Sequence, residues 1–417
     1  MRTTWRVLAG HRDLRLVLSA GVISQTGDWI LTVGLLYRVY AMTGSTVATA
    51  LAMLSSLLPQ VLLGSVAGVF ADRWDRKRTM IAADLLLAAG LLPLLAVRGA
   101  GQVWIVFAVL AWEGVVEQFF TPTQQALVPR LVPAEHLLAA NALSGQVSDV
   151  SRLVGSGLGG VIAAVGGLPA VALADASSFA ASAVLLALVR ASGRPARDMS
   201  AGRKIAVVAA ELHDGIRLSV THPFLRALLV FGLVTSVGEG IFGTLITPFV
   251  REVLHGSSAE FGLVAAAQAV GGIAGGLFAA SLSQRFSPLR LFMVSSVVFG
   301  LVDLAIFLYP LGYVALWPAV AGMIVVGLPS ALTIAAMTTL IQRHTEDSYR
   351  GRVFGALGTA EGTAALAGTL AAGWLSRPLG IIPVLAIQGA GYVFGGLGMS
   401  LWLRTGTATA GTAVLAK

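Results

Sequence analysis

Long apolar runs, each about 20 residues or more, dominate this chain, and short polar segments separate them. A helix of about 20 apolar residues crosses about 30 Å of hydrocarbon, so each run predicts a transmembrane helix. Open strands cannot satisfy their backbone polar groups in lipid, and the runs are too long for barrel strands. The pattern predicts an all-α polytopic membrane protein with twelve transmembrane helices, at 14–40, 47–71, 78–97, 102–126, 141–165, 168–190, 224–250, 258–282, 289–309, 314–341, 352–375 and 380–403.

The composition supports a membrane protein and excludes several other classes. Of 417 residues, 56% are hydrophobic and 12% charged, whereas soluble domains are about 45–50% apolar and about 25% charged. This excludes a soluble cytosolic enzyme, a disordered chain and a secreted disulfide-rich domain. The absence of cysteine excludes a thiolate metal site and thiol redox chemistry.

The net charge of +8 could indicate nucleic-acid binding, but the distribution of Lys and Arg favours a membrane explanation. Most of the 28 basic residues fall in the predicted inner segments, and the predicted outer loops hold only Arg98, Arg251 and Arg377. Positively charged loops stay on the cytoplasmic side. We therefore expect a multi-pass protein of the inner or plasma membrane with both termini in the cytoplasm, lipid as its surroundings, and no nucleic-acid partner.

The chain divides into two halves with a weak internal repeat. The longest polar segment separates six predicted helices from six, which gives these expected domains: a six-helix half at 1–190, a cytoplasmic linker loop at 191–222, a six-helix half at 223–404, and a low-complexity cytoplasmic tail at 405–417 that we expect to be disordered. A shift of about 212 residues places Gly27-Asp28 over Gly238-Glu239 and Asp149 over Glu361. Two halves related by a parallel repeat are typical of an alternating-access transporter with its site near mid-membrane.

The segment from Gly68 to Arg78, GVFADRWDRKR, joins the second and third predicted helices. It resembles the signature loop of the major facilitator superfamily, in which a Gly and three further residues precede Asp-Arg and a basic cluster. The stretches TGDW, LVPAEHLLAANAL, DASSF and SYRGRVFG narrow the resemblance to the drug-exporter branch that holds macrolide-efflux proteins and the enterobactin exporter. The resemblance covers nearly the whole chain and implies the major facilitator fold, with two pseudo-symmetric six-helix halves and no cofactor.

The signature loop supplies candidates for a conformational latch. These are Gly68, Asp72, Arg73 and Arg76. Asp72 can accept hydrogen bonds from the free N–H groups at a helix N-terminus, which the resemblance places at the eleventh helix. Arg73 and Arg76 can pair with acids across the inner seam between the halves. The alternative for Arg76, Lys77 and Arg78 is that they only set the topology.

Nine of the 20 acidic residues fall inside predicted spans and more than one turn from their ends, where charge is costly and usually faces a cavity or a partner. Asp28 and Glu239 lie mid-span at repeat-related positions, and the resemblance implies that their helices line the central cavity. Burial away from water disfavours the charged form of a carboxyl group, so both are candidates to carry a proton. The alternative is a structural carboxylate that accepts hydrogen bonds from a neighbouring helix.

Two further sets of charges lie on single helix faces. Glu113 and Glu117 are four residues apart, so they share one face of the fourth helix and repel each other when both are charged. They suit a proton site or a cationic-substrate site, or else they bridge a buried cation such as Arg152. Asp149 and Arg152 can meet on the fifth helix as a switchable ion pair. Glu361, the repeat mate of Asp149, lacks a matching Arg; Asp175 and Asp303 lie nearer the outer ends and are weaker candidates.

Other chemistry is not visible in the sequence. There is no P-loop motif and no H-E-x-x-H motif, and the six His are scattered, so no nucleotide, metal or other cofactor is expected. The predicted function is a monomeric secondary transporter that exports amphipathic small molecules by alternating access in exchange for protons. An importer or a lipid flippase of the same fold is the alternative, and a membrane-embedded enzyme or receptor is a third class without a visible catalytic set.

Overall fold

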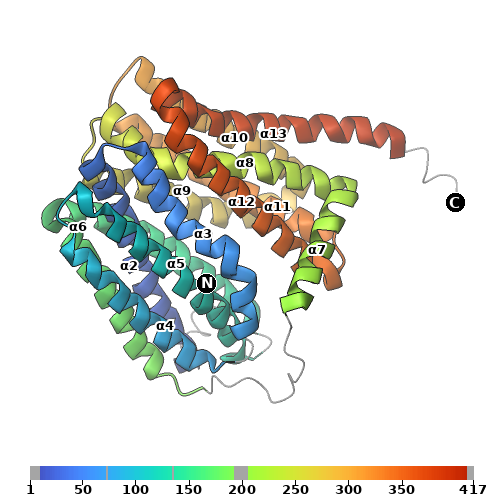
Figure 1. Cartoon of the computed structure of the whole chain (residues 1–417). Coiled ribbons are helices and arrows are strands. Elements are labelled where there is room, and N and C mark those ends of the chain that lie inside the picture. Colours follow the sequence, from blue (N-terminus) through green and yellow to red (C-terminus); the bar gives the residue numbers. More distant parts are fainter. Residues whose placement is uncertain (1–9, 72–73, 134–135, 192–204, 411–417) are drawn as a thin grey trace. The chain divides into compact units, whose positions relative to one another are not determined.

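The computed structural model describes residues 10–71, 74–133, 136–191 and 205–410, and helices make up most of these residues (Figure 1). The described residues contain no β-strand. The chain separates into two compact units. The first comprises Met1–Ala210 together with Val250–Ala269, and the second comprises Glu211–Phe249 together with Val270–Lys417. The prediction of an all-α membrane fold is confirmed.

Among the described residues, unit 1 contains five long helices, which are α2 (Arg12–Thr43), α3 (Thr46–Ala71), α4 (Arg76–Leu91), α5 (Val103–Leu127) and α6 (Leu137–Ala187). Helix α2 packs mainly against α6, α3 packs against α5, and α4 packs against both α5 and α6. The 250–269 segment joins this unit through close backbone contact. The Tyr37 hydroxyl donates to the Gly256 carbonyl at 3.1 Å, and a Cβ at position 262 would lie 3.0 Å from the Gly160 Cα.

Unit 2 contains α7 (Ile205–Thr221, from residue 211), α8 (Pro223–Pro248), the end of α9 (Ser258–Arg285), α10 (Pro288–Leu308), α11 (Trp317–Arg343), α12 (Asp347–Leu379) and α13 (Ile381–Ala410). Helix α8 packs against α12 and α13, and α10 packs against α11 and α13. The contacts of α2 with α6, which holds the fifth and sixth spans, correspond to those of α8 with α12 and α13. The contacts of α4 with α5 and α6 correspond to those of α10 with α11 and α13. The two units repeat one packing scheme, as the internal sequence repeat predicts.

Every predicted span coincides with a helix, although the helices differ in their apolar character. Among the described residues, ten helices are long and apolar enough to cross a membrane. Helix α6 counts once among these but contains the two predicted spans at 141–165 and 168–190. Helix α12 is not among the ten, because its middle is rich in Gly and Thr and contains Glu361, which lower its hydropathy.

The turn between the two halves of α6 depends on one glycine. Gly167 has φ 63° and ψ −158°, a region that residues with a side chain avoid. Pro169 follows and starts the next helical segment, since it needs no N–H donor there. The sequence thus separates two transmembrane segments with a break of very few residues.

The linker and the tail differ from the loops that the sequence predicts. Residues 205–221 form α7, which a search for long apolar runs misses because this helix is short and amphipathic. Its Gly215 contacts the backbone carbonyl of Arg352 on α12, and Asp214 pairs with the Arg352 guanidinium at 3.2 Å. At the other end, α13 continues to Ala410, so the first residues of the expected tail are helical. The domain boundaries at 190 and 222 remain predictions.

Candidate functional site: two carboxylate centres

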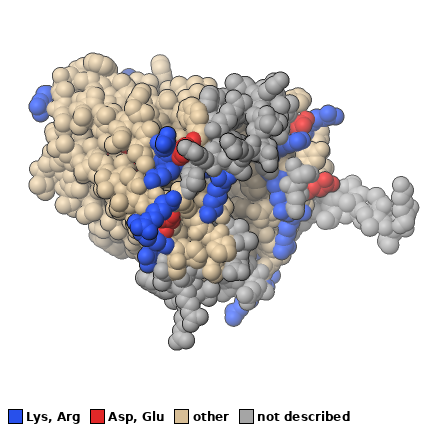
Figure 2. Space-filling view, turned by 90° about the horizontal axis from the view of Figure 1, so that it is seen from below, with Lys and Arg blue, Asp and Glu red and all other residues tan. Residues whose placement is uncertain are grey.

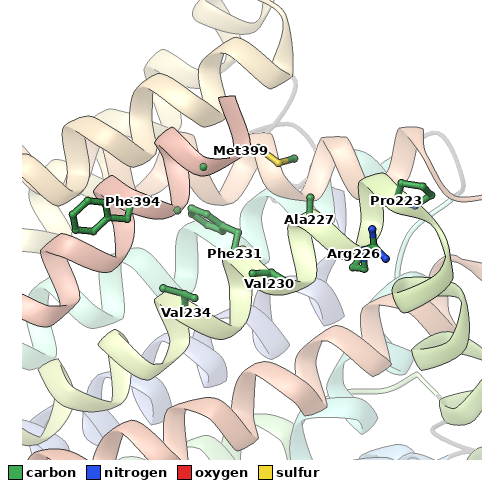
Figure 3. Close-up of a pocket in the computed structure, with 10 residues that line it drawn as sticks. Pro223, Arg226, Ala227, Val230, Phe231, Val234, Phe394 and Met399 are labelled. Carbon is green, nitrogen blue, oxygen red and sulfur yellow. The ribbon is translucent and has the colours of Figure 1, made fainter. Parts of the chain in front are cut away.

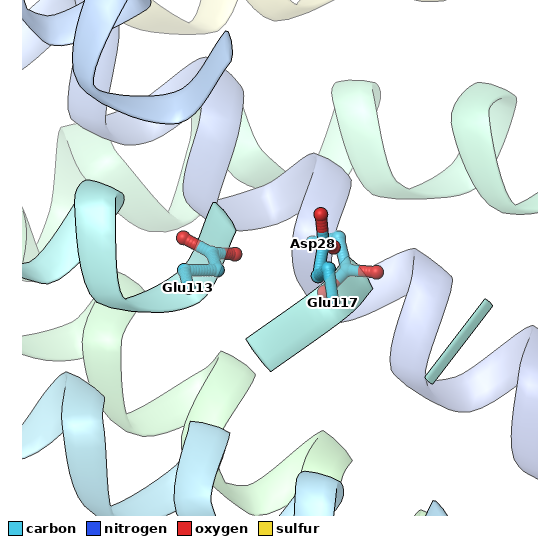
Figure 4. A group of neighbouring side chains, drawn as sticks. All are labelled: Asp28, Glu113 and Glu117. Carbon is cyan, nitrogen blue, oxygen red and sulfur yellow. The ribbon is translucent and has the colours of Figure 1, made fainter. Parts of the chain in front are cut away.

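Three carboxyl groups of unit 1 converge from two helices. Asp28 lies in the middle of α2, and Glu113 and Glu117 lie one turn apart on α5. One oxygen of each lies within 4.8 Å of the others, and all three side chains are half-buried. Figure 4 shows the Asp28 and Glu117 carboxyl groups close together and Glu113 farther along α5. The shared face of Glu113 and Glu117 follows from their spacing, whereas the approach of Asp28 follows from helix packing.

Asp175 on α6 is a fourth carboxyl group beside this cluster. Its side chain is fully buried, and one oxygen accepts a hydrogen bond from the Ser178 hydroxyl at 3.1 Å. The other oxygen has no hydrogen-bond partner among the described residues. Asp175 and Ser178 fill the space where a Cβ of Gly27 would stand, and Asp175 interacts electrostatically with Asp28. The sequence analysis ranked Asp175 as a weaker candidate near the outer end of its span, and the structure places it beside Asp28.

Glu239 forms the centre of a hydrogen-bonded network in unit 2. Its Oε1 accepts from the Tyr392 hydroxyl at 2.7 Å and from the Gln388 amide at 3.3 Å, both on α13. Asp303 on α10 is almost fully buried and interacts electrostatically with Glu239. The sequence analysis named Glu239 but missed Tyr392, because an aromatic residue in a membrane helix gives no signal of its own.

The two centres occupy repeat-related positions and differ in chemistry. In unit 1, Gly27 packs on Asp175, and in unit 2 a Cβ at Gly238 would lie 3.0 Å from the Gln388 Cα. When the two halves are aligned by the sequence repeat, Asp175 falls next to Gln388. The repeat-related glycines Gly27 and Gly238 therefore contact an acid in unit 1 and an amide in unit 2. Among the described residues, Glu239 has side-chain donors, whereas one Asp28 oxygen has no hydrogen-bond partner.

Glu361, Asp149 and Arg152 are not members of the carboxyl cluster of unit 1 or of the hydrogen-bonded network of Glu239. Glu361 on α12 is half-buried, and its carboxyl group occupies the space beside Gly232 of α8. Asp149 and Arg152 on α6 interact electrostatically. They form no ion pair in the part of the chain that the structure describes, so the predicted switchable bridge is not closed in this structure.

The signature loop is described only in part. Asp72 and Arg73 lie outside the described residues, and Gly68 lies near the end of α3. Arg76 begins α4 and is buried, with only 9% of its surface exposed. Asp75 caps α4 by accepting from the Arg78 backbone N–H at 3.1 Å, and Lys77 donates to the carbonyls of Ala187 and Val189 at 2.8 and 2.7 Å. The latch remains a prediction.

Ten helices of membrane-spanning length among the described residues, in two units that repeat one packing scheme, are typical of a polytopic membrane transporter. The chain belongs to the transmembrane secretion effector family of the major facilitator superfamily, which it matches over residues 3–412. The resemblance identified in the sequence is confirmed.

The similar proteins include exporters of named function. Macrolide efflux protein A of Streptococcus pyogenes is 25% identical over 332 residues, which cover 79% of this chain and 81% of that protein. The enterobactin exporter EntS of Citrobacter koseri is 25% identical over 407 residues, which cover 95% and 93%. Among solved structures, a bacterial homologue of the iron transporter ferroportin in the inward-facing state superposes with a TM-score of 0.72 at 17% identity, covering 94% of this chain and 98% of that one. The structural likeness shows the fold.

Proposed function

We propose that this protein is a secondary active exporter that couples the outward movement of amphipathic small molecules to the inward movement of protons. Its transporter class is established by its family. The direction of transport is inferred from the macrolide and enterobactin exporters among its relatives. The names of those relatives, which refer to a macrolide and to enterobactin, favour a small-molecule substrate here, which we propose to be amphipathic.

The observation that carries proton coupling is the cluster of Asp28, Glu113 and Glu117. Carboxylate charges at this separation repel one another, and a membrane bundle gives them little water to screen that repulsion. The cluster therefore needs protons or a cation to be stable. No Lys or Arg forms an ion pair with any of the three among the described residues, which favours a mobile positive charge over a fixed one.

A carboxyl cluster couples the two movements only if its proton load differs between the two faces of the membrane. In the proposed cycle, the cluster gains protons when it is open to the outside and loses them when it is open to the cytoplasm. A cationic or neutral amphipathic substrate then binds when the cluster has released its protons. Glu239 is held by Tyr392 and Gln388, so we assign it to substrate orientation in the second half.

The proposed topology places both termini in the cytoplasm of a bacterial cell, with a monomer in the inner membrane. The Lys and Arg distribution supports this orientation, and Figure 2 shows one face on which basic side chains outnumber acidic ones. The ion pair of Asp214 and Arg352 joins α7 to the N-terminal end of α12, and the sequence places both on the inner side.

The direct test is a transport assay with the purified protein in liposomes. We expect efflux of a cationic amphipathic dye when a pH gradient is imposed, without ATP. A collapse of the gradient by a protonophore should stop net efflux. Efflux that needs ATP, or that a sodium gradient drives instead, would contradict proton coupling, and accumulation in the opposite direction would contradict export.

A further inference from the structure

An apolar groove runs along the surface of unit 2 between α8 and α13 (Figure 3). It is lined on α8 by Arg226, Val230 and Val234, and on α13 by Phe394 and Met399. Val230 is 54% exposed and Phe394 is 72% exposed. Large apolar side chains with this exposure need an apolar environment outside the protein or a bound apolar molecule.

The position and length of the groove fit one leaflet of a bilayer. Both helices belong to candidate membrane spans, Pro223–Val253 and Ile381–Met399. The lining residues on α8 extend from Pro223 to Val234, which corresponds to about 16 Å along a helix axis. Half of the hydrocarbon thickness is about 15 Å. The groove is therefore about as long as one phospholipid acyl chain.

One end of the groove is positively charged. Arg226 lies in the first turn of α8 and is exposed, and its guanidinium makes no hydrogen bond or ion pair within the described residues. The N-terminus of a helix adds partial positive charge at the same end. A guanidinium at the end of an apolar groove matches the headgroup phosphate of a phospholipid, which basic pockets between membrane helices recognise.

The floor of the groove depends on glycine. At Gly395 a Cβ would lie 2.8 Å from the Phe231 ring, so this glycine lets the two helices pack closely. At Gly398 a Cβ would meet nothing within 4 Å. A larger side chain at Gly398 would therefore enter the groove without disturbing the packing of α8 on α13.

Unit 1 has a comparable groove between α4 and α5, lined by Arg78, Trp112 and Phe119. Asp75 also lines that groove and partly offsets the charge of Arg78. The groove of unit 2 contains no acidic lining residue, and it is the stronger anion site.

We propose that the α8–α13 groove binds an anionic phospholipid, with its headgroup phosphate at Arg226 and one acyl chain along Val230, Val234 and Phe394. This site lies on the bilayer-facing surface and is separate from the two carboxylate centres. Its ligand is a resident lipid of the inner leaflet and not the exported substrate.

The test uses the full-length protein, purified in detergent and titrated with phosphatidylglycerol or phosphatidylcholine, with bound lipid counted by native mass spectrometry. Arg226→Gln should weaken phosphatidylglycerol binding about fivefold and should weaken phosphatidylcholine binding less, because the choline cation already offsets the charge of the phosphate. Gly398→Leu should weaken the binding of both lipids. The matched controls are Arg343→Gln, an exposed arginine at the end of α11, and Gly276→Leu, a glycine of α9 that also has open space around it.

Equal binding of the two lipids by the unaltered protein would overturn the proposal, as would losses in the controls as large as those in the groove variants. Binding of the exported dye that competes with phosphatidylglycerol and is lost in Gly398→Leu would also overturn it, because the groove would then be a substrate site. A variant that changes the elution volume or helical content would be replaced by Val230→Trp, which fills the groove from α8 and should give the same loss.

Discussion

At the scale of single residues, the two carboxylate centres show how packing selects partners that spacing alone does not reveal. The separation of Glu113 and Glu117 places them on one helix face, and the sequence repeat pairs Asp28 with Glu239. The contacts of Asp28 with α5, and of Glu239 with Tyr392, depend on which helices adjoin, and a single sequence does not state this. Glycines set two of the helix contacts beside these centres: Gly27 lets α2 approach Asp175 and Ser178 of α6, and Gly238 lets α8 approach Gln388 of α13.

Asp175 illustrates the limit of judging depth from position in a span. The sequence analysis ranked Asp175 as a weaker candidate because it lies nearer the outer end of its predicted span. Because Asp175 is fully buried against Gly27 and beside Asp28, we now expect Asp175→Asn to lower gradient-driven efflux at least as far as Glu361→Gln does. Efflux rates from liposomes at equal protein content would check this. An unchanged rate would support the ranking of Asp175 as a weaker candidate.

The Tyr392 hydroxyl should contribute measurably to the stability of unit 2. Tyr392→Phe removes the donor to Glu239 at 2.7 Å and keeps the ring. A hydrogen bond between membrane helices contributes about 0.6 to 1.7 kcal/mol, so the free energy of unfolding in mixed detergent should fall by about that amount. Tyr349→Phe is the control, since the Tyr349 hydroxyl has no hydrogen bond among the described residues. Equal losses in the two variants would mean that the Glu239 network is not the cause.

At the scale of helices, most of the fold could be predicted from the sequence. Apolar runs of membrane-spanning length gave all the spans, because in lipid each helix must be apolar along its own length. The sequence did not reveal α7, whose amphipathic pattern is too short for that search. It did separate the two halves of α6, which meet at the turn at Gly167.

The turn at Gly167 should be sensitive to the smallest substitution. With φ 63° and ψ −158°, an alanine there would be strained by about 1 to 3 kcal/mol, so Gly167→Ala should lower the melting temperature in detergent. Gly145→Ala, in the same helix with nothing near its Cβ position, should change stability by less than about 1 kcal/mol and in the stabilising direction. A Gly167 variant as stable as the Gly145 variant would show that the turn adapts.

The contact of α7 with α12 should depend on close packing more than on charge. Gly215 contacts the Arg352 carbonyl directly, so Gly215→Leu should detach α7 and make it a faster site of limited proteolysis. Asp214→Asn breaks an ion pair whose two side chains are 32% and 48% exposed, and such pairs contribute about 0 to 1 kcal/mol. The Asp214→Asn variant should therefore leave the cleavage pattern unchanged. Faster cleavage in Asp214→Asn alone would reverse this ranking.

At the scale of the whole molecule, the orientation in the membrane rests on the distribution of Lys and Arg. The natural chain lacks cysteine, so single cysteines can report the topology directly. Ala100→Cys, in a predicted outer loop, should react with an impermeant maleimide added to intact cells. His213→Cys, exposed on α7, should react only after the membrane is opened. The opposite pattern would place both termini outside and would reverse the proposed direction of the proton.

The most direct test of proton coupling through the carboxyl cluster is gradient-driven efflux from proteoliposomes that contain variants with one acidic residue neutralised. Asp28→Asn and Glu113→Gln are expected to abolish efflux driven by a pH gradient and to leave part of the downhill exchange, because the cluster loses its exchangeable charge while the helices keep their packing. Asp214→Asn, an exposed acid far from the cluster in sequence, is the control and should transport normally. If Asp28→Asn and Glu113→Gln both keep gradient-driven efflux at the unaltered rate, the carboxyl cluster of α2 and α5 does not carry the coupling proton.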